Sequence, residues 1–316
     1  MVKVSVIIPV RAINDYIRKC IEEINNQSFK DFEIIVITDQ PSNEKFKKTK
    51  MMASFDKINP GDKRDIAAKK AKGKFIAFID DDAYPDKDWL KNTLKNFEDP
   101  NIGAVGGPGL HPPEDSFMQL IGSKILESKL ASGTEDYRCI IGQRKYVDDY
   151  PTFNLTVRKD VFDSVGGFNY DYYRGEDTKL CIEIIKTGKK IVYDPTSIVY
   201  HHRRALFKPH LRQMWQCSVY RGFFAKRFPQ TSLRFAYFVP TLFVFGLVFG
   251  LILSFFNKYL AYAYIGVLAL YVLLLIKESL AIKGIKAKLL LMIGIFITHV
   301  TYGIGIIKGL LAKELQ

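Results

Sequence analysis

The chain has 316 residues, which is enough for one or two structural units with a sizeable core. Its net charge of +13 lies entirely in the C-terminal part, since residues 1–200 hold 31 basic and 31 acidic residues and residues 201–316 hold 15 basic and 2 acidic residues. Because this excess stands beside long apolar runs rather than over a folded face, it favours an anionic membrane surface and argues against nucleic acid as a partner.

The first 100 residues alternate between β-branched apolar runs and amphipathic segments, which predicts an α/β fold with a largely parallel sheet. The Lys-rich stretch 43–50 is expected to be solvated surface. The first apolar run is too short for a signal peptide, so the N-terminal domain is expected to remain in the cytoplasm. The predicted strands cover residues 4–10, 32–37 and 74–79, and the predicted helices cover residues 14–27 and 62–72.

Acidic residues follow two of these predicted strands. Asp39 ends the second strand, and Asp80, Asp81 and Asp82 end the third. Ligands of parallel sheets bind at the carboxyl ends of the strands, so these acids are expected to face one crevice. Three adjacent carboxylates repel one another unless a divalent cation or a ribose engages them, and their hard oxygens suit Mg²⁺ or Mn²⁺. No Gly-rich phosphate loop precedes them, which disfavours a kinase or an ATPase.

The middle of the chain is less regular. Glycines and prolines between residues 103 and 113 predict a strand that leads into a loop near the same edge, and residues 190–193 predict another strand. A helical section is expected after Asp160. The four cysteines lie far apart and lack metal-ligand spacing, so they are expected to be small thiols in a reducing compartment.

The C-terminal part carries the signs of a membrane protein. Residues 203–234 combine eight Lys or Arg residues and no acids with interleaved aromatic and aliphatic residues, which predicts amphipathic helices in the membrane interface. Long apolar runs then predict three transmembrane helices, at residues 235–256, 259–276 and 289–307. The Lys-rich loop 277–288 and residues 203–234, called the basic segment below, are expected on the cytoplasmic side, and the C-terminus is expected outside. The protein is thus predicted to be a multi-pass protein of the cell membrane. His299 is expected to pack between helices. The predicted domains are 1–202, 203–234 and 235–316.

Seven segments, taken in order, resemble the inverting family 2 glycosyltransferases with a GT-A fold. They resemble in particular the branch with the succinoglycan-type and archaeal lipid-glycan transferases. The resemblance covers residues 2 to about 230. The segments are Val4 to Pro9, Glu33 to Asp39, Arg64 with Gly73, Asp80 to Asp82, Gly166 to Phe168, Glu176-Asp177 and His201.

The resemblance implies a division of roles on the donor side. Asp39 would contact the nucleobase and Arg64 the nucleotide or its phosphates. Asp80 and Asp82 would form a DXD pair, with Asp80 mostly at the ribose and Asp82 at Mg²⁺ or Mn²⁺. His201 would lie near the diphosphate or the metal, or have a structural role. Donor binding would also involve Pro9, Arg11 and Asp81.

The resemblance also implies an acceptor side. Asp177 would be the general base that deprotonates an acceptor hydroxyl for in-line attack, which predicts inversion at the anomeric carbon. Glu176 would shape the acceptor pocket. A further group on the basic segment could close over the donor: Arg212, Gln213, Gln216 and Tyr220.

Three functions remain open at this stage. The first is transfer of a sugar from a UDP- or GDP-sugar to a hydroxyl of a lipid-linked glycan or glycolipid. The second is a polyprenyl-phosphate monosaccharide synthase, whose phosphate acceptor needs little deprotonation, so that Asp177 would matter less. The third is a non-catalytic membrane scaffold, which would have lost its acidic residues; Asp82, Glu176 and Asp177 are all present.

Overall fold

The structure is a computed structural model that describes residues 2–168 and 175–315. The chain divides into two compact units. The first unit contains Met1–Pro112 and Tyr137–His202, and the second contains Pro113–Asp136 and Arg203–Gln316. Residues 113–136, which the sequence analysis placed in the N-terminal domain, therefore belong to the second unit. Their helices carry apolar residues that pack against the last helix of the chain.

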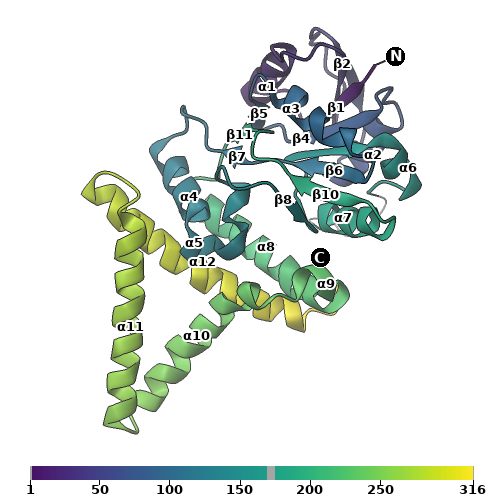
Figure 1. The fold of residues 1–316 in the computed structure, drawn as a ribbon. Helices are drawn as coiled ribbons and strands as arrows, with labels where there is room; N and C mark the ends of the chain where they lie inside the picture. The colour runs from purple at the N-terminus through teal and green to yellow at the C-terminus, as the bar shows by residue number, and fades with distance from the viewer. Residues whose placement is uncertain (1, 169–174, 316) are drawn as a thin grey trace. The chain divides into compact units, whose positions relative to one another are not determined.

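The first unit is an α/β domain built on an eight-stranded sheet with the order β3-β2-β1-β4-β9-β6-β10-β8 (Figure 1). Its strands are β1 (Val4–Pro9), β2 (Phe32–Thr38), β3 (Thr49–Ala53), β4 (Phe75–Ile79), β6 (Ile102–Gly106), β8 (Lys145–Val147), β9 (Asn154–Arg158) and β10 (Lys190–Tyr193). Its helices are α1 (Asp15–Asn25), α2 (Pro60–Ala68), α3 (Trp89–Lys95), α6 (Lys159–Ser164) and α7 (Glu176–Lys186).

The pairing of β1 fixes where the acidic residues lie. β1 pairs in parallel with both β2 and β4, so the three strands end at the same edge of the sheet. All six residues of β1 and all five of β4 are buried, as expected of strands covered on both faces. The Asn14 side chain accepts a hydrogen bond from the backbone N–H of Ile17 at 3.0 Å and caps α1.

The edge strand β3 was not predicted from the sequence. The lysines of the stretch 43–50 are exposed, as expected of solvated surface, and Thr49 and Lys50 at its end begin β3, which pairs in parallel with β2 at the edge of the sheet. Charged residues are common on edge strands, which conceals such strands from a hydrophobic-pattern search. β9 runs antiparallel between β4 and β6, and the sheet is otherwise mostly parallel, which confirms the largely parallel sheet predicted from the sequence.

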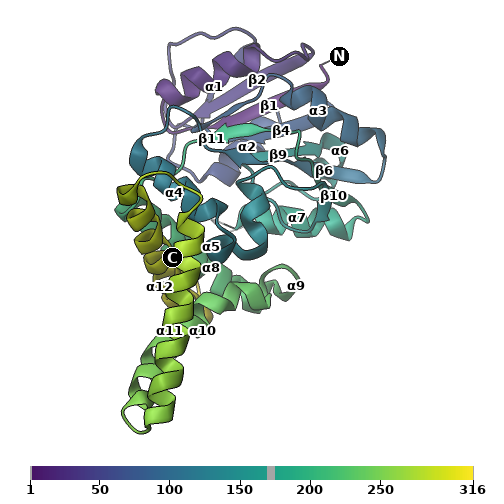
Figure 2. The same ribbon diagram turned by 60° about the vertical axis from the view of Figure 1, so that its left-hand side comes forward.

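A small second sheet, whose middle strand is labelled in Figure 2, brings the segment around residue 200 to the acidic triplet through its strand pairing. It contains β5 (Ala83–Pro85), β11 (Val199–His201) and β7 (Gly109–Leu110) in the order β5-β11-β7. β5 and β11 are antiparallel, and His201 pairs with Ala83. Because Ala83 directly follows Asp82, this register places the His201 side chain next to the end of β4.

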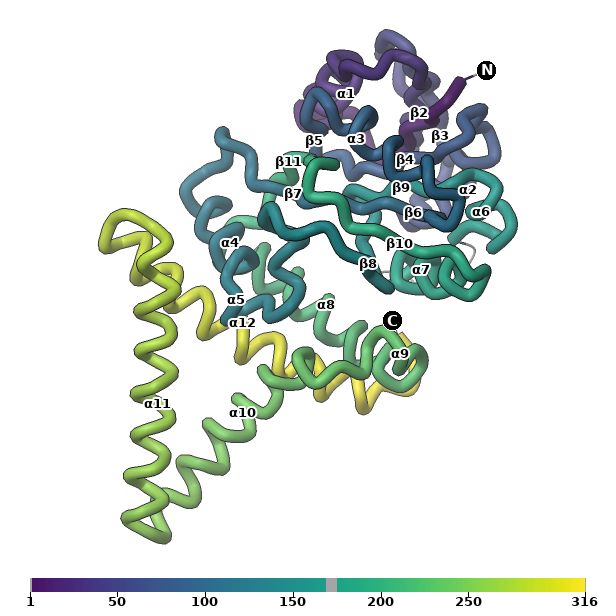
Figure 3. Tube along the Cα trace, viewed as in Figure 1, coloured from purple at the N-terminus to yellow at the C-terminus, as the bar shows by residue number. Residues whose placement is uncertain are grey.

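The second unit is helical (Figure 3). Its helices are α4 (Phe117–Glu127), α5 (Lys129–Ser132), α8 (Lys208–Arg227), α9 (Pro229–Ser232), α10 (Phe235–Ser254), α11 (Lys258–Ser279) and α12 (Ile285–Leu311). α10, α11 and α12 are each long and apolar enough to cross a membrane.

The basic segment differs from a simple interfacial helix. Its apolar residues were expected to face lipid, but Leu206, Met214, Phe223 and Phe224 are buried inside the protein. The reason is that α8 packs along α12. A side chain at Gly305 or Gly309 would collide with α8, because an ideal Cβ there lies 1.9 Å from the Ser218 hydroxyl and 2.0 Å from the Val219 carbonyl oxygen respectively.

Histidines add polar contacts between these helices. The His210 Nε2 of α8 lies 2.9 Å from the Thr298 hydroxyl of α12. The His299 Nδ1 lies 2.8 Å from the hydroxyl of Tyr271 in α11, and its Nε2 lies 2.9 Å from the carbonyl oxygen of Leu130 in α5. His299 thus has the contacts of a packing residue, as the sequence analysis expected. Of the cysteines, only Cys217 is exposed.

Candidate active site

Asp39 follows the end of β2 and faces the first turns of α2. Its backbone N–H donates to the carbonyl oxygen of Arg11 at 3.0 Å, and its carboxylate forms an ion pair with Lys63. The Lys63 ammonium also donates to the carbonyl oxygen of Val10 at 2.6 Å. Lys63 thereby ties the ends of β1 and β2 together. Pro9 is buried at the end of β1, whereas the Arg11 side chain is exposed.

Arg64 connects the two acidic groups of the site. Its guanidinium lies 2.7 Å from Asp80 Oδ1 and 3.6 Å from Glu176 Oε1, and its side chain is only 4% exposed. Within the described residues, Arg64 Nε and Glu176 Oε2 are buried without a hydrogen-bond partner. Buried polar atoms of this kind are rarely left unsatisfied in a working protein, so they mark a place where a ligand can bind.

The pair Gly166-Gly167 leads into Phe168, which packs near Arg64. Gly167 has a φ of +73°, and a Cβ there would lie 2.4 Å from Asp65 Oδ1. The same carboxylate accepts a hydrogen bond from the backbone N–H of Phe168 at 2.8 Å. The Phe168 ring is buried and lies 5.7 Å from the Arg64 guanidinium carbon. Residues 169–174, which complete this motif, lie outside the described residues.

Asp80, Asp82 and His201 form a group that could hold a metal ion. One ligand atom from each lies within 4.8 Å of the others, and His201 Nε2 is 3.1 Å from Asp82 Oδ1. The backbone of β5 and β11 keeps them together. Asp82 is buried, and Asp81, the middle residue of the triplet, is partly exposed. The structure thus brings together the three residues that the sequence predicts as metal ligands, and their roles stay predictions.

Asp177 lies in the first turn of α7, next to Glu176. Burial, followed by the negative charges of Glu176 and Asp149, raises the pKa of Asp177 from 3.8 to about 7. The backbone N–H of Thr178, which donates to Asp177 Oδ1 at 2.8 Å, and the Arg64 guanidinium act in the opposite direction. A carboxylate with a pKa near neutrality is suited to accept a proton at physiological pH.

Two residues that the sequence analysis missed support this arrangement. One is Lys63, which stands in the charged run 62–65 and which no pattern in the sequence distinguishes from its neighbours. The other is Asp149, which is 3% exposed and accepts a hydrogen bond from the Thr178 hydroxyl at 2.9 Å. Arg138 Nη2 lies 3.6 Å from Asp149 Oδ2. Asp149 therefore fixes the first turn of α7 from outside the helix, and no signal in one sequence reveals such a contact.

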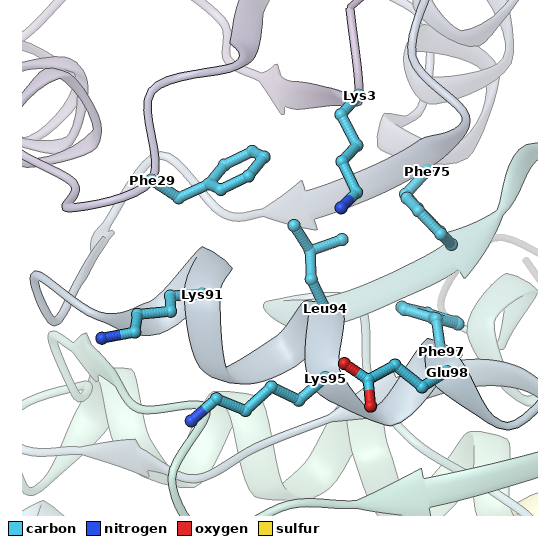
Figure 4. A pocket seen from close by; sticks show the side chains of 8 residues that line it. All are labelled: Lys3, Phe29, Phe75, Lys91, Leu94, Lys95, Phe97 and Glu98. Atoms are coloured by element: carbon cyan, nitrogen blue, oxygen red, sulfur yellow. The ribbon is translucent and has the colours of Figure 1, made fainter.

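The gating residues predicted from the sequence belong to the second unit, and a cavity of the first unit lies at the other end of its strands. Arg212, Gln213, Gln216 and Tyr220 are on α8 in the second unit, where Tyr220 is buried, and their gating role stays a prediction. A cavity of about 280 Å³ lies near Lys3 and Phe75, at the starts of β1 and β4 and hence at the opposite edge of the sheet from the acids (Figure 4).

Known proteins resemble the chain along its whole length. Residues 5–166, just over half of the chain, match the family Glycosyl transferase family 2. The chain is 25% identical, over 98% of its length and 97% of the relative, to the dolichyl N-acetyl-alpha-D-glucosaminyl phosphate 3-beta-D-2,3-diacetamido-2,3-dideoxy-beta-D-glucuronosyltransferase of Methanococcus voltae. It is 25% identical to the glucosyl-dolichyl phosphate glucuronosyltransferase of Haloferax volcanii over 73% of this chain and 80% of that protein.

A solved structure extends the likeness to the fold. It is a mannosyltransferase from Pyrobaculum calidifontis, solved in complex with GDP-Man and Mn²⁺, with a TM-score of 0.58 and 16% sequence identity. The match covers 99% of this chain and 88% of that chain. The predicted GT-A fold with added C-terminal apolar helices is thereby confirmed. The chain belongs to glycosyl transferase family 2.

Proposed function

We propose that the protein transfers a sugar, with inversion, from a nucleotide-diphosphate sugar to a hydroxyl of a glycan carried on a membrane lipid. The observation that carries this proposal is the position of Asp177, whose pKa is about 7, directly after Glu176, which lies 3.6 Å from the Arg64 guanidinium. Arg64 also contacts Asp80, so one buried cation stands between the acidic pair of α7 and a candidate metal ligand. The names of both archaeal relatives refer to a dolichyl phosphate that carries a sugar, which supports this acceptor class.

The proposed chemistry needs one base. Asp177 accepts the proton of the acceptor hydroxyl, the acceptor oxygen forms a bond to the anomeric carbon, and the bond from that carbon to the diphosphate oxygen breaks with its electron pair. Attack opposite the leaving group inverts the anomeric configuration. Arg64 and Lys63, both buried cations beside strand-end acids, would help to balance the negative charge of the donor.

Asp80, Asp82 and His201 fit a divalent cation. Two carboxylates and an imidazole within one cluster are suitable ligands for Mn²⁺, and the carboxylates also suit Mg²⁺. Such an ion would neutralise the departing diphosphate. The Pyrobaculum mannosyltransferase was solved with Mn²⁺, which supports this expectation.

A screen of nucleotide-sugar donors tests the proposal, with the full-length protein in detergent and Mg²⁺ or Mn²⁺ present. It measures nucleoside-diphosphate release from UDP- and GDP-sugars with either a polyprenyl phosphate or a glycosyl polyprenyl phosphate as acceptor. We expect release only with the glycosylated lipid, and a loss of about 10²- to 10⁴-fold in kcat for Asp177→Asn. No release with any donor would contradict the proposal.

The same experiment separates the alternative function. A polyprenyl-phosphate monosaccharide synthase would use the unglycosylated lipid phosphate and would retain near-normal turnover in Asp177→Asn, since a phosphate monoester is already ionised near neutral pH. These two results together would show that the acceptor group is a phosphate and not a hydroxyl.

A further inference from the structure

α12 differs from the other two apolar helices in how much of it the protein covers. In its most apolar stretch 44% of the residues are buried, against 11% in α10 and 6% in α11. α10 and α11 form a hairpin whose closed end extends away from α12, whereas the start of α10 contacts α12 through the Thr241 hydroxyl, which donates to the carbonyl oxygen of Gly303 at 3.1 Å (Figure 1). Length and composition allow all three helices to cross a bilayer, so their contacts must decide which of them do.

Charged helices cover α12 along one face. Its first half packs against α4, where Ile121 and Ile125 share a buried cluster with Leu291 and Ile295. His299 contacts α5 through the carbonyl oxygen of Leu130.

Its second half packs against α8. This contact runs from the pair His210 and Thr298 to the Lys226 ammonium, which donates to the carbonyl oxygen of Ala312 at 2.6 Å. α8 therefore lies beside α12 from residue 298 to its C-terminal end.

These covering helices cannot accompany α12 through hydrocarbon. α8 carries five Lys or Arg residues in 20, and its longest run without a charge, 213–220, has eight residues where a crossing needs about 20. α4 has 11 residues and carries the ion pair between Lys124 and Glu127. Charges at the centre of a bilayer are strongly disfavoured, so a helix bound side by side to α4 and α8 cannot stand along the membrane normal.

We propose that α12 lies in the membrane interface together with α8, and that only the hairpin of α10 and α11 crosses the bilayer. The partner of this surface is a bilayer with anionic headgroups, because residues 203–234 carry eight basic residues and no acidic one. The uncovered face of α12 fits the acyl region. Its exposed apolar residues recur at helical spacing: Ile285, Leu289, Ile293, Ile304 and Leu311.

This arrangement changes the topology expected from the sequence. Two crossings, down α10 and back through α11, return the chain to the side from which it entered. The loop between α11 and α12 and the C-terminal residues after Leu311 then lie on the same side as Arg234. Three crossings would instead place the C-terminus on the opposite side.

Cysteine labelling of the full-length protein in sealed vesicles tests the inference. The background is Cys217→Ser, since Cys217 is the exposed native thiol and the other three cysteines are buried. Single reporters at exposed positions are Asn257→Cys at the hairpin tip, Lys283→Cys before α12 and Lys313→Cys after it. A membrane-impermeant maleimide is added to right-side-out and to inverted vesicles, and permeabilised vesicles give the complete reaction.

We expect Lys283→Cys and Lys313→Cys to react from the same side and Asn257→Cys from the other. Reaction of Lys313→Cys from the side of Asn257→Cys would show that α12 crosses, and would overturn the inference. Reaction of all three from one side would overturn it as well, because the hairpin would then not cross. The measurement does not use transferase activity, so its outcome is independent of the proposed function.

Discussion

At the scale of single residues, the pKa of Asp177 results from effects that raise it and smaller effects that lower it. A helix N-terminus stabilises a carboxylate, typically by about 0.3–1 kcal/mol, and would lower its pKa. The pKa of Asp177 is nevertheless raised to about 7, so burial and the charges of Glu176 and Asp149 outweigh the helix, the Thr178 N–H and Arg64. The chain thus keeps a proton acceptor of near-neutral pKa where an ordinary Asp would be too weak a base.

The first prediction is a pH dependence. A base must be deprotonated to act, so kcat/KM is full above a pKa of about 7 and falls as the pH drops through that value. Below it, the rate should fall tenfold for each pH unit. Initial rates of nucleoside-diphosphate release from about pH 5 to about pH 9 measure this fall, which is the acid limb of the pH profile. A profile that stays flat down to the ordinary pKa of an Asp would contradict the role of Asp177.

A second prediction concerns Arg64. Arg64→Lys keeps the positive charge but loses the planar group that contacts both Asp80 and Glu176, so kcat/KM should fall about 10- to 100-fold. Lys69→Met removes an exposed cation from the end of the same helix and should leave the rate unchanged. Equal losses in both variants would mean that general charge, rather than the bridge, matters.

A third prediction separates two effects of Asp149. Asp149→Asn removes a negative charge near Asp177 and leaves the Arg138 cation without its carboxylate, and both changes lower the pKa of Asp177. The acid limb of kcat/KM should therefore move to lower pH, by about one unit.

Thr178→Val is the matched variant, because it removes the hydroxyl contact and keeps the charge. It should lower kcat with little movement of the limb. If neither variant moves or lowers the pH profile, Asp149 has no part in positioning Asp177.

At the scale of elements, the packing of α8 on α12 depends on small residues. An ideal Cβ at Gly309 lies 2.0 Å from the backbone oxygen of Val219, which cannot move aside without shifting α8. Gly309→Ala should therefore destabilise the protein by about 1–3 kcal/mol, as overpacking does in cores, and lower its Tm in detergent. Gly266→Ala on α11, where a Cβ has no neighbour within 4 Å, is the control and should not lower the Tm.

The elements also show what a sequence can predict. Asp39 and the Asp80–Asp82 triplet could be placed at one sheet edge, because parallel strands end together and both strands were apolar enough to recognise. The burial of Lys63 could not be predicted, since its neighbours in the run 62–65 look solvated and only the direction of α2 turns it inward. Residues 113–136 belong to the second unit because they pack against α12, and such contacts between distant segments cannot be predicted from the local sequence pattern.

At the scale of the whole molecule, the membrane part is more than a removable anchor. The first unit is interrupted by Pro113–Asp136, whose helices share a buried cluster with α12. α8, which directly follows the first unit in the chain, buries Met214, Phe223 and Phe224. The last three helices therefore complete a core that begins near residue 113.

A fifth prediction concerns a chain shortened after Arg234, which keeps the first unit, α4, α5 and α8 but loses α10, α11 and α12. Without α12, the apolar faces of α4 and α8 are exposed to water, and contiguous apolar patches of this kind promote association. We expect the shortened chain to aggregate and to bind a hydrophobic dye, whereas the full chain in detergent elutes as a single species in size-exclusion chromatography. A soluble, monodisperse shortened chain with full transferase activity would show instead that α8 is stable without α12 and that the apolar helices only tether the enzyme.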